Sequence, residues 1–152
     1  MLSFLDRLMS SGMVGSVLAD PKSDFALQVF NLTRASVGSS TDKFKLMGCI
    51  DIYCHLIQVK GDVRNKSLGR IQIIICHRFG WLRKLVASKF YEALMVYEDE
   101  VIPDPNDLET ALSILSDTEW ATIPIEEART IRNKLSQILG IPAPKLVSNV
   151  TQ

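Results

Sequence analysis

Three cysteines and two histidines are the side chains of this sequence best suited to metal binding or thiol chemistry. They occur as Cys49, as the pair Cys54 and His55 in "DIYCHLI", and as the pair Cys76 and His77 in "IIICH". Common zinc sites use C-x-x-C or H-x-x-x-H spacings, and neither is present. On a helix, two adjacent residues point about a quarter of a turn apart. We therefore expect free thiols buried as small hydrophobic side chains, with the histidines at the edge of the core.

Other catalytic patterns are weak. The sequence contains no G-x-x-x-x-G-K-[ST] phosphate loop, no H-E-x-x-H and no G-x-S-x-G. Ser40 and Lys43 form an S-x-x-K, but this short pattern often arises by chance and lies in a polar loop. Glu126 and Glu127 fall in the first turn of a predicted helix, where the helix dipole favours carboxylates. A binding or assembly module without a cofactor is the better prediction than an enzyme.

The composition is that of a folded domain with balanced charge. The 152 residues are 47% hydrophobic and 22% charged, and 17 basic residues balance 17 acidic ones. This balance lacks the basic surface that non-specific nucleic-acid binding needs. No segment approaches the roughly 18 apolar residues of a membrane span. Asp6 and Arg7 interrupt the first apolar run, which argues against a signal peptide. We expect a cytoplasmic protein.

Apolar residues recur at helical spacing along the whole chain. The run "IQIIIC" could form a strand, but its flanks keep the 3.6-residue period, so we expect a helix there. Asp42 is a candidate N-cap, Pro105 suits a first helical turn, and Gly140 is a candidate left-handed C-cap. The acidic segment 98–107 is predicted to be a linker. The pattern predicts an all-α fold of about seven helices, at 2–11, 24–36, 43–60, 63–78, 81–97, 105–115 and 124–139.

One aromatic residue lies near the turn before the last helix. Ser116 and Glu119 have the spacing of a capping box, which would make Leu115 and Trp120 the hydrophobic staple of that helix. In this interpretation Trp120 is a structural wedge between the last two helices. The alternative is that it anchors a partner.

Two segments suggest a repeated unit. "GDVRNKSLGRI" and "GWLRKLVASKFYEAL" both place an apolar residue and an arginine (Val63–Arg64 and Leu82–Arg83) after a turn, followed by an apolar stripe. Consecutive helices with tight turns are typical of HEAT- or armadillo-like solenoids. A plain helical bundle fits the periodicity nearly as well.

The same segments carry a family resemblance. "GDVRNKSLGRI", "CHRFGWLRKLVASKFYEALMVY", "LSDTEW" and "RNKLSQILGIPAPKLV", in this order, resemble the C-terminal end of the tubulin-folding cofactor D family. The resemblance is strongest over 43–147 and fainter over 1–42, so residues 1–152 are interpreted as a single C-terminal domain. Family members are many times longer, and the chain corresponds to their terminal portion. Where the family usually carries proline, this chain has Gly80, which we expect to loosen that corner.

The resemblance implies a function that the residues alone do not. It implies a helical-repeat protein that binds β-tubulin and, with tubulin-folding cofactors E and C and an Arf-like small GTPase, assembles or dismantles the αβ-tubulin heterodimer. Such a complex stimulates GTP hydrolysis by tubulin, and the protein would be cytoplasmic and associated with the cytoskeleton. The alternative is a free-standing helical-repeat adaptor with no tubulin function.

Candidate partner contacts are basic, because tubulin is acidic. They are Arg83 and Lys84 on one helix and Arg129 and Arg132 on the last. The alternative for Arg83 is a hydrogen bond between helices, and for the others a solvated surface. Without a preceding repeat, the first helix would expose Phe4, Leu8 or Met9, which predicts weak self-association.

Overall fold

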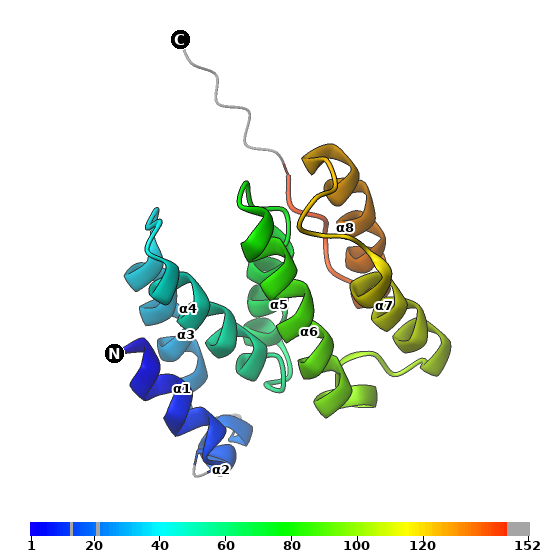
Figure 1. The fold of residues 1–152 in the computed structure, drawn as a ribbon. Coiled ribbons are helices and arrows are strands. Elements are labelled where there is room, and N and C mark those ends of the chain that lie inside the picture. The colour runs from blue at the N-terminus through cyan, green and yellow to red at the C-terminus, as the bar shows by residue number, and fades with distance from the viewer. Residues whose placement is uncertain (13, 21, 146–152) are drawn as a thin grey trace.

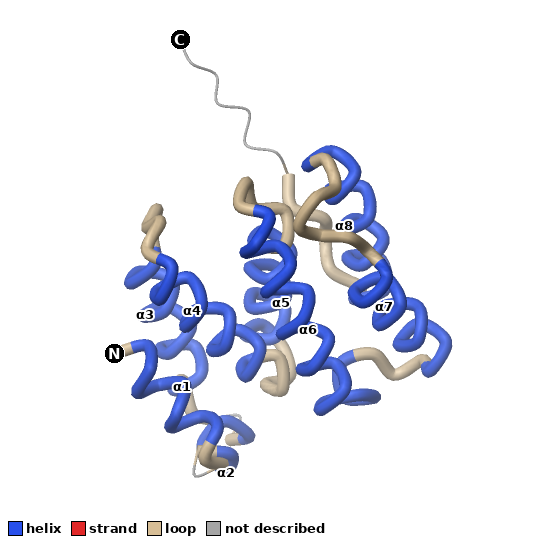
Figure 2. The backbone as a smooth tube through the Cα atoms, viewed as in Figure 1, coloured by secondary structure: helices blue, strands red, loops and turns tan. Residues whose placement is uncertain are grey.

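The chain folds entirely into α-helices joined by turns (Figures 1 and 2). The computed structural model describes residues 1–12, 14–20 and 22–145, and this part contains eight helices and no strand. The prediction of an all-α fold is confirmed. The helices are α1 (Leu2–Ser10), α2 (Gly15–Ala19), α3 (Phe25–Val37), α4 (Lys43–Leu56), α5 (Asp62–Ile74), α6 (Gly80–Val101), α7 (Pro105–Asp117) and α8 (Ile125–Leu139).

Consecutive helices run back and forth and stack side by side (Figure 1). Helix α4 is central and contacts α1, α3, α5 and α6, while α6 contacts α7 and α7 contacts α8. Helices α3 and α5 also touch, so neighbouring helix pairs stack in two layers, an arrangement consistent with a helical-repeat fold. Because the helices alternate in direction, the turns 38–42, 75–79 and 118–124 lie at the same end of the molecule. We call this end the turn face.

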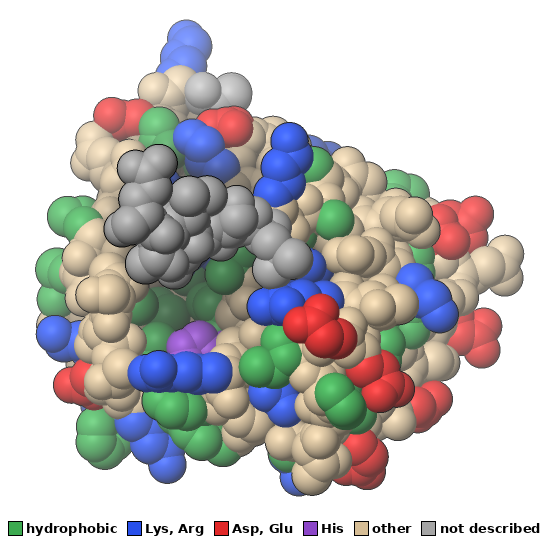
Figure 3. Space-filling view, turned by 90° about the horizontal axis from the view of Figure 1, so that it is seen from above, with side chains coloured by type: hydrophobic (Ala, Val, Ile, Leu, Met, Phe, Trp, Pro, Cys, Tyr) green, Lys and Arg blue, Asp and Glu red, His purple; other side chains and the backbone are tan. Residues whose placement is uncertain are grey.

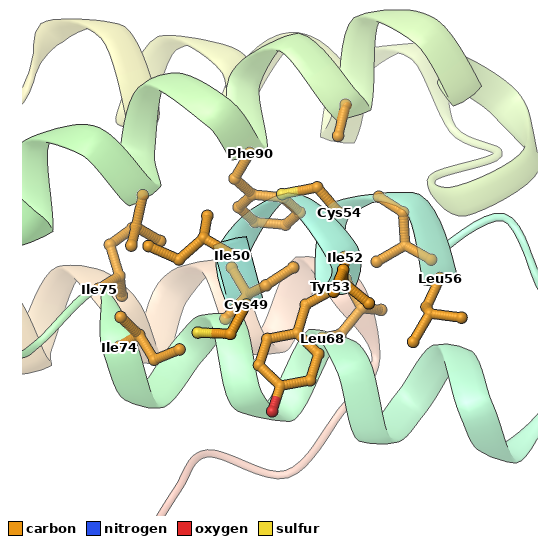
Figure 4. Packing of buried hydrophobic residues seen from close by; sticks show 14 of the residues in the cluster. Cys49, Ile50, Ile52, Tyr53, Cys54, Leu56, Leu68, Ile74, Ile75 and Phe90 are labelled. Atoms are coloured by element: carbon orange, nitrogen blue, oxygen red, sulfur yellow. The ribbon is translucent and has the colours of Figure 1, made fainter. Parts of the chain in front are cut away.

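The core lies where α4, α5 and α6 meet (Figure 4). Ile50, Ile52 and Tyr53 of α4 are at most 1% exposed, and Phe90 of α6 is fully buried. The rings of Phe30 and Tyr53 lie 5.6 Å apart and link α3 to this core. Burying each large apolar side chain contributes roughly 1.5–3 kcal/mol. Dense packing of the middle helices thus holds the turns in place.

Local signals set several helix ends as predicted. The Asp42 carboxylate accepts hydrogen bonds from the backbone N–H groups of Phe44 (2.9 Å) and Lys45 (3.2 Å) and caps α4. Pro105 occupies the first turn of α7. Gly140 ends α8 with φ 67° and ψ 26°, a left-handed conformation that glycine adopts without steric cost.

Two parts of the helix prediction are wrong. The short helix α2 was not predicted; its Leu18 is buried and attaches it to the core. The segment 98–107 is mostly not a linker, because α6 continues to Val101 through a break at Glu98 (φ 28°) and α7 starts at Pro105. Val101 and Ile102 are buried, which draws this acidic segment onto the core despite its charge.

The first helix exposes one of its three predicted apolar residues. Phe4 is 66% exposed, whereas Met9 is buried and Leu8 is half-buried. Docking of α1 on α4 explains the difference, because it covers the side that carries Met9. Within the described residues, every helix is too short or too polar to cross a bilayer.

Candidate interaction surface

Arg83, near the start of α6, connects the turn at 75–79 with the turn at 118–124. Its side chain is buried, and Nε donates to the carbonyl oxygen of Trp120 at 2.7 Å. Its other nitrogens donate to the carbonyl oxygens of His77 (3.0 Å), Ala121 (3.3 Å) and Ile123 (3.1 Å). The inter-helix hydrogen bond that was the alternative for Arg83 is confirmed. With these donors used inside the chain, the geometry does not support Arg83 as a partner contact.

Trp120 is a packing residue of the same corner. It is 2% exposed, and its indole Nε1 donates to the carbonyl oxygen of Leu115 at 3.1 Å. The predicted capping box of Ser116 and Glu119 is wrong, because α7 continues past Ser116 and α8 begins well after Glu119. Trp120 therefore lies in the turn itself, where its backbone carbonyl accepts from Arg83 and its buried indole contacts the end of α7 through Leu115.

Gly80 allows these two turns to approach closely. A Cβ atom at position 80 would lie only 2.1 Å from the carbonyl oxygen of Ala121. Any larger residue would push the α7–α8 turn away, so the expectation that Gly80 loosens this corner is wrong. The absence of a side chain is what lets the backbones touch.

The candidate cations of α8 differ from one another. Arg132 is buried and donates to the Gln72 carbonyl oxygen (3.4 Å) and the Asn133 side chain (3.0 Å), so it is not a surface residue. Arg129 forms a partly exposed ion pair with Glu126 at 2.6 Å, and such pairs contribute little to stability. Lys84 is exposed. Of the four candidates, Lys84 and Arg129 are the two accessible to a partner.

The thiols behave as the sequence predicted. Cys49 and Cys54 are buried, and Cys76 is half-buried. Burial raises the pKa of Cys49 to about 12 and also raises the pKa of Cys54 and of Cys76, although Arg132, Arg129 and Arg83 near Cys76 oppose that rise. Protonated thiols are poor nucleophiles and metal ligands. No group of three or more metal-ligating side chains occurs in the described ranges.

One arrangement has the composition of a catalytic triad without its geometry. The His55 Nε2 atom lies 3.1 Å from the Ser10 hydroxyl and 3.2 Å from the Asp6 carboxylate. A serine nucleophile needs the serine and the carboxylate on opposite ring nitrogens. Here both groups meet the same nitrogen, and the Ser10 hydroxyl donates to the Asp6 carbonyl oxygen. The contact holds α1 on α4.

The turn face carries residues that sequence reasoning missed. Seen end-on (Figure 3), it shows basic side chains and a histidine around a hollow with hydrophobic walls. The rings of His77, Phe79 and Trp81 follow one another at 5.0 and 6.2 Å. Arg78 lies over Phe79 and Lys43 over Trp81, at 4.9 and 5.3 Å from the ring centroids. The alternation of aromatic and basic residues in "HRFGW" could have indicated this row of stacked rings and cations.

No protein-family model matches the chain, and no solved structure matches it. The candidate surface is therefore defined by geometry: the turn face, with Lys84, Arg129, Arg78 and Lys43 as its cations and Trp81, 40% exposed, as its apolar part. Tryptophan and arginine are enriched at protein-binding surfaces, and Trp81 and Arg78 supply both here.

Proposed function

We propose that this chain is a C-terminal domain of the tubulin-folding cofactor D type, which binds β-tubulin. In this proposal it acts with tubulin-folding cofactors E and C and an Arf-like small GTPase to assemble or dismantle the αβ-tubulin heterodimer. It performs no chemistry of its own and activates GTP hydrolysis only within that complex. Its expected location is the cytoplasm, in association with the cytoskeleton.

One observation carries the proposal: the stretches that resemble the family lie apart in the sequence but meet in space. "CHRFGWLRK" supplies Arg83 and "LSDTEW" supplies Trp120, and the Arg83 side chain donates to the Trp120 carbonyl oxygen. A resemblance that includes both halves of one tertiary contact is more specific than a resemblance between isolated helices.

The surface chemistry also supports an acidic partner. Lys84 and Arg129 remain accessible near the turn face, together with the exposed Arg78. Basic residues at the rim of an interface speed association with an acidic protein and make it dependent on salt. The stacked helices offer the extended surface that binding a large partner requires.

A binding experiment tests the proposal. The full chain is immobilised, and its binding to purified β-tubulin and to the Arf-like GTPase is measured at two salt concentrations. We expect β-tubulin to bind, more slowly at high salt, and GTP hydrolysis by tubulin to rise when cofactors C and E are added with the chain. Binding of neither protein would overturn the proposal and favour a free-standing adaptor.

Matched charge reversals locate the surface. Arg129→Glu is expected to lower the association rate for β-tubulin several-fold. Lys66→Glu is the control, because Lys66 has a similar ion pair within its own helix, with Asp62 at 2.7 Å, and lies in the first turns of α5, away from the turn face. Equal rates for the two variants would exclude the Arg129 side of the turn face as the β-tubulin contact.

A further inference from the structure

A pocket of about 190 Å³ opens between the α3–α4 turn and the end of α5. It has no carboxylate in its wall. Its polar side chains come from the α3–α4 turn and from the C-terminal part of α5 with the residues that follow it. The turn contributes three hydroxyl groups, and α5 with the residues after it contributes two arginines and a histidine. These residues are Ser39, Ser40, Thr41, Arg70, His77 and Arg78.

The two arginines of this pocket lack acidic partners. Neither Arg70 nor Arg78 belongs to any of the ion pairs of the described residues. The Nε atom of Arg70 is buried without a hydrogen-bond partner within that part of the chain. The guanidinium lies beside the Tyr53 hydroxyl, and its charge and a side-chain hydrogen bond oppose the rise that burial causes in the pKa of Tyr53. Because Arg70 and Arg78 both line the pocket, two positive charges lie in its wall without a carboxylate to balance them.

Two further lining groups, Ser40 and His77, have a proton to donate. Ser40 Oγ accepts from the Asp42 backbone N–H at 3.1 Å, so its own proton is free to point elsewhere. His77 Nδ1 accepts from the Phe79 backbone N–H at 3.2 Å, which leaves Nε2 as the protonated nitrogen of the neutral ring. Burial lowers the pKa of His77, and Arg78 and Arg83 lower it further, so the neutral ring prevails.

The nearest carboxylate along the chain does not fill the pocket. Asp42 follows Thr41, but its Oδ1 accepts from the backbone N–H groups of Phe44 and Lys45 at the start of α4. This contact also means that the N-terminus of α4 is already capped. The anion-binding capacity of the pocket comes from side chains.

We propose that this pocket binds a phosphate group. Guanidinium groups form paired, charge-assisted hydrogen bonds with oxyanions, and two arginines with three hydroxyls offer more donors than the two oxygens of a carboxylate can use. A phosphate monoester presents three strong acceptor oxygens. The pocket has room for such a group but not for a nucleotide base and sugar as well. This inference does not rest on the tubulin proposal, although Arg78 belongs both to the pocket and to the candidate interaction surface.

Calorimetric titration of the full chain tests the site. The probes are inorganic phosphate, a short phosphoserine peptide and the same peptide without the phosphate. We expect saturable binding of inorganic phosphate and of the phosphopeptide and none of the unmodified peptide. Tighter binding of the phosphopeptide would identify a phosphorylated chain as the source of the group, and equal binding would identify the free anion. Absence of saturable binding of both phosphate probes would overturn the proposal.

Substitutions assign the binding to this pocket. Arg70→Gln and Arg78→Gln are each expected to weaken binding by about tenfold or more, the effect of one charge-assisted hydrogen bond. Arg78 is exposed, so its substitution tests the site without risk to folding. Arg7→Gln, at an exposed arginine of α1, is the control and should bind as the unmodified chain does. The assignment of phosphate binding to this pocket would be contradicted if Arg7→Gln weakened binding as much as the pocket variants do. It would also be contradicted if neither Arg70→Gln nor Arg78→Gln weakened binding.

Discussion

Two arginines near the turn face, Arg83 and Arg70, have opposite surroundings. Arg83 is 4% exposed and donates to four backbone carbonyl oxygens between 2.7 and 3.3 Å. Arg70 is half-buried, and its buried Nε has no partner among the described residues. The comparison shows that burial does not by itself distinguish a structural cation from a binding cation. A structural cation differs from a binding cation in that the chain itself supplies acceptors for its guanidinium donors.

The neighbouring turns explain the difference. The α7–α8 turn presents the carbonyl oxygens of Trp120, Ala121 and Ile123 toward α6, and a guanidinium satisfies them together. The α3–α4 turn places hydroxyl groups in the wall of the pocket that Arg70 also lines, and the carbonyl oxygen of Val37 already accepts from the Ser40 backbone N–H at 2.8 Å. The α7–α8 turn supplies acceptors for the guanidinium of Arg83. Within the described part of the chain, the α3–α4 turn supplies no backbone acceptor to Arg70, and both line the pocket.

The largest effect is expected from Arg83→Met. The substitution keeps most of the volume but leaves the Trp120 carbonyl oxygen and its neighbours without a donor. We expect the free energy of unfolding to fall by about 3 kcal/mol, as for other buried groups that lose a charged partner. Chemical denaturation measures this. Lys84→Met, at the adjacent exposed cation, is the control and should change stability by less than about 0.5 kcal/mol. Similar losses in both variants would show that the corner does not depend on Arg83.

A smaller effect is expected from Gly80→Ala. The new Cβ would meet the Ala121 carbonyl oxygen and separate the two turns that Arg83 joins. We expect a loss of about 1–3 kcal/mol, the usual cost of overpacking. Gly69→Ala is the matched control, because Gly69 lies within α5 and a Cβ atom there would meet no other element within 4 Å. At that position alanine should stabilise the chain by about 0.5–1 kcal/mol. Thermal denaturation should therefore show a lower melting temperature for Gly80→Ala and a higher one for Gly69→Ala.

The fold was largely predictable from local patterns. Helical periodicity identified the long helices, and Asp42, Pro105 and Gly140 marked their ends because caps act over a few residues. The segment 98–107 was mispredicted because its charges indicated a linker, while burial of Val101 and Ile102 depends on contacts far along the chain. Local patterns cannot reveal such contacts.

The candidate surface was predicted less well, for the same reason. The sequence left Arg83 open between a partner contact and a hydrogen bond between helices, and it offered only exposed roles for Arg132. The carbonyl oxygens that decide both cases come from residues some 40 to 60 positions away. Gly80 looked like a point of weakness because its contact at Ala121 is equally distant. The pocket at Arg70 depends on the α3–α4 turn, which periodicity identifies only as a break between helices.

The smallest effect on stability is expected from Arg70→Met, and it is the most direct test of the comparison. No carbonyl oxygen loses a donor in this variant, and an unpaired buried Nε is removed. We therefore expect the free energy of unfolding to change by less than about 1 kcal/mol, measured by the same denaturation as for Arg83→Met. Burial raises the pKa of Tyr53, and the charge of Arg70 and a side-chain hydrogen bond with Arg70 oppose that rise. In Arg70→Met the pKa of Tyr53 should therefore rise further, which ultraviolet titration can follow. A loss of stability as large as that of Arg83→Met would mean that Arg70 is also a structural cation, and the distinction between the two arginines would fail.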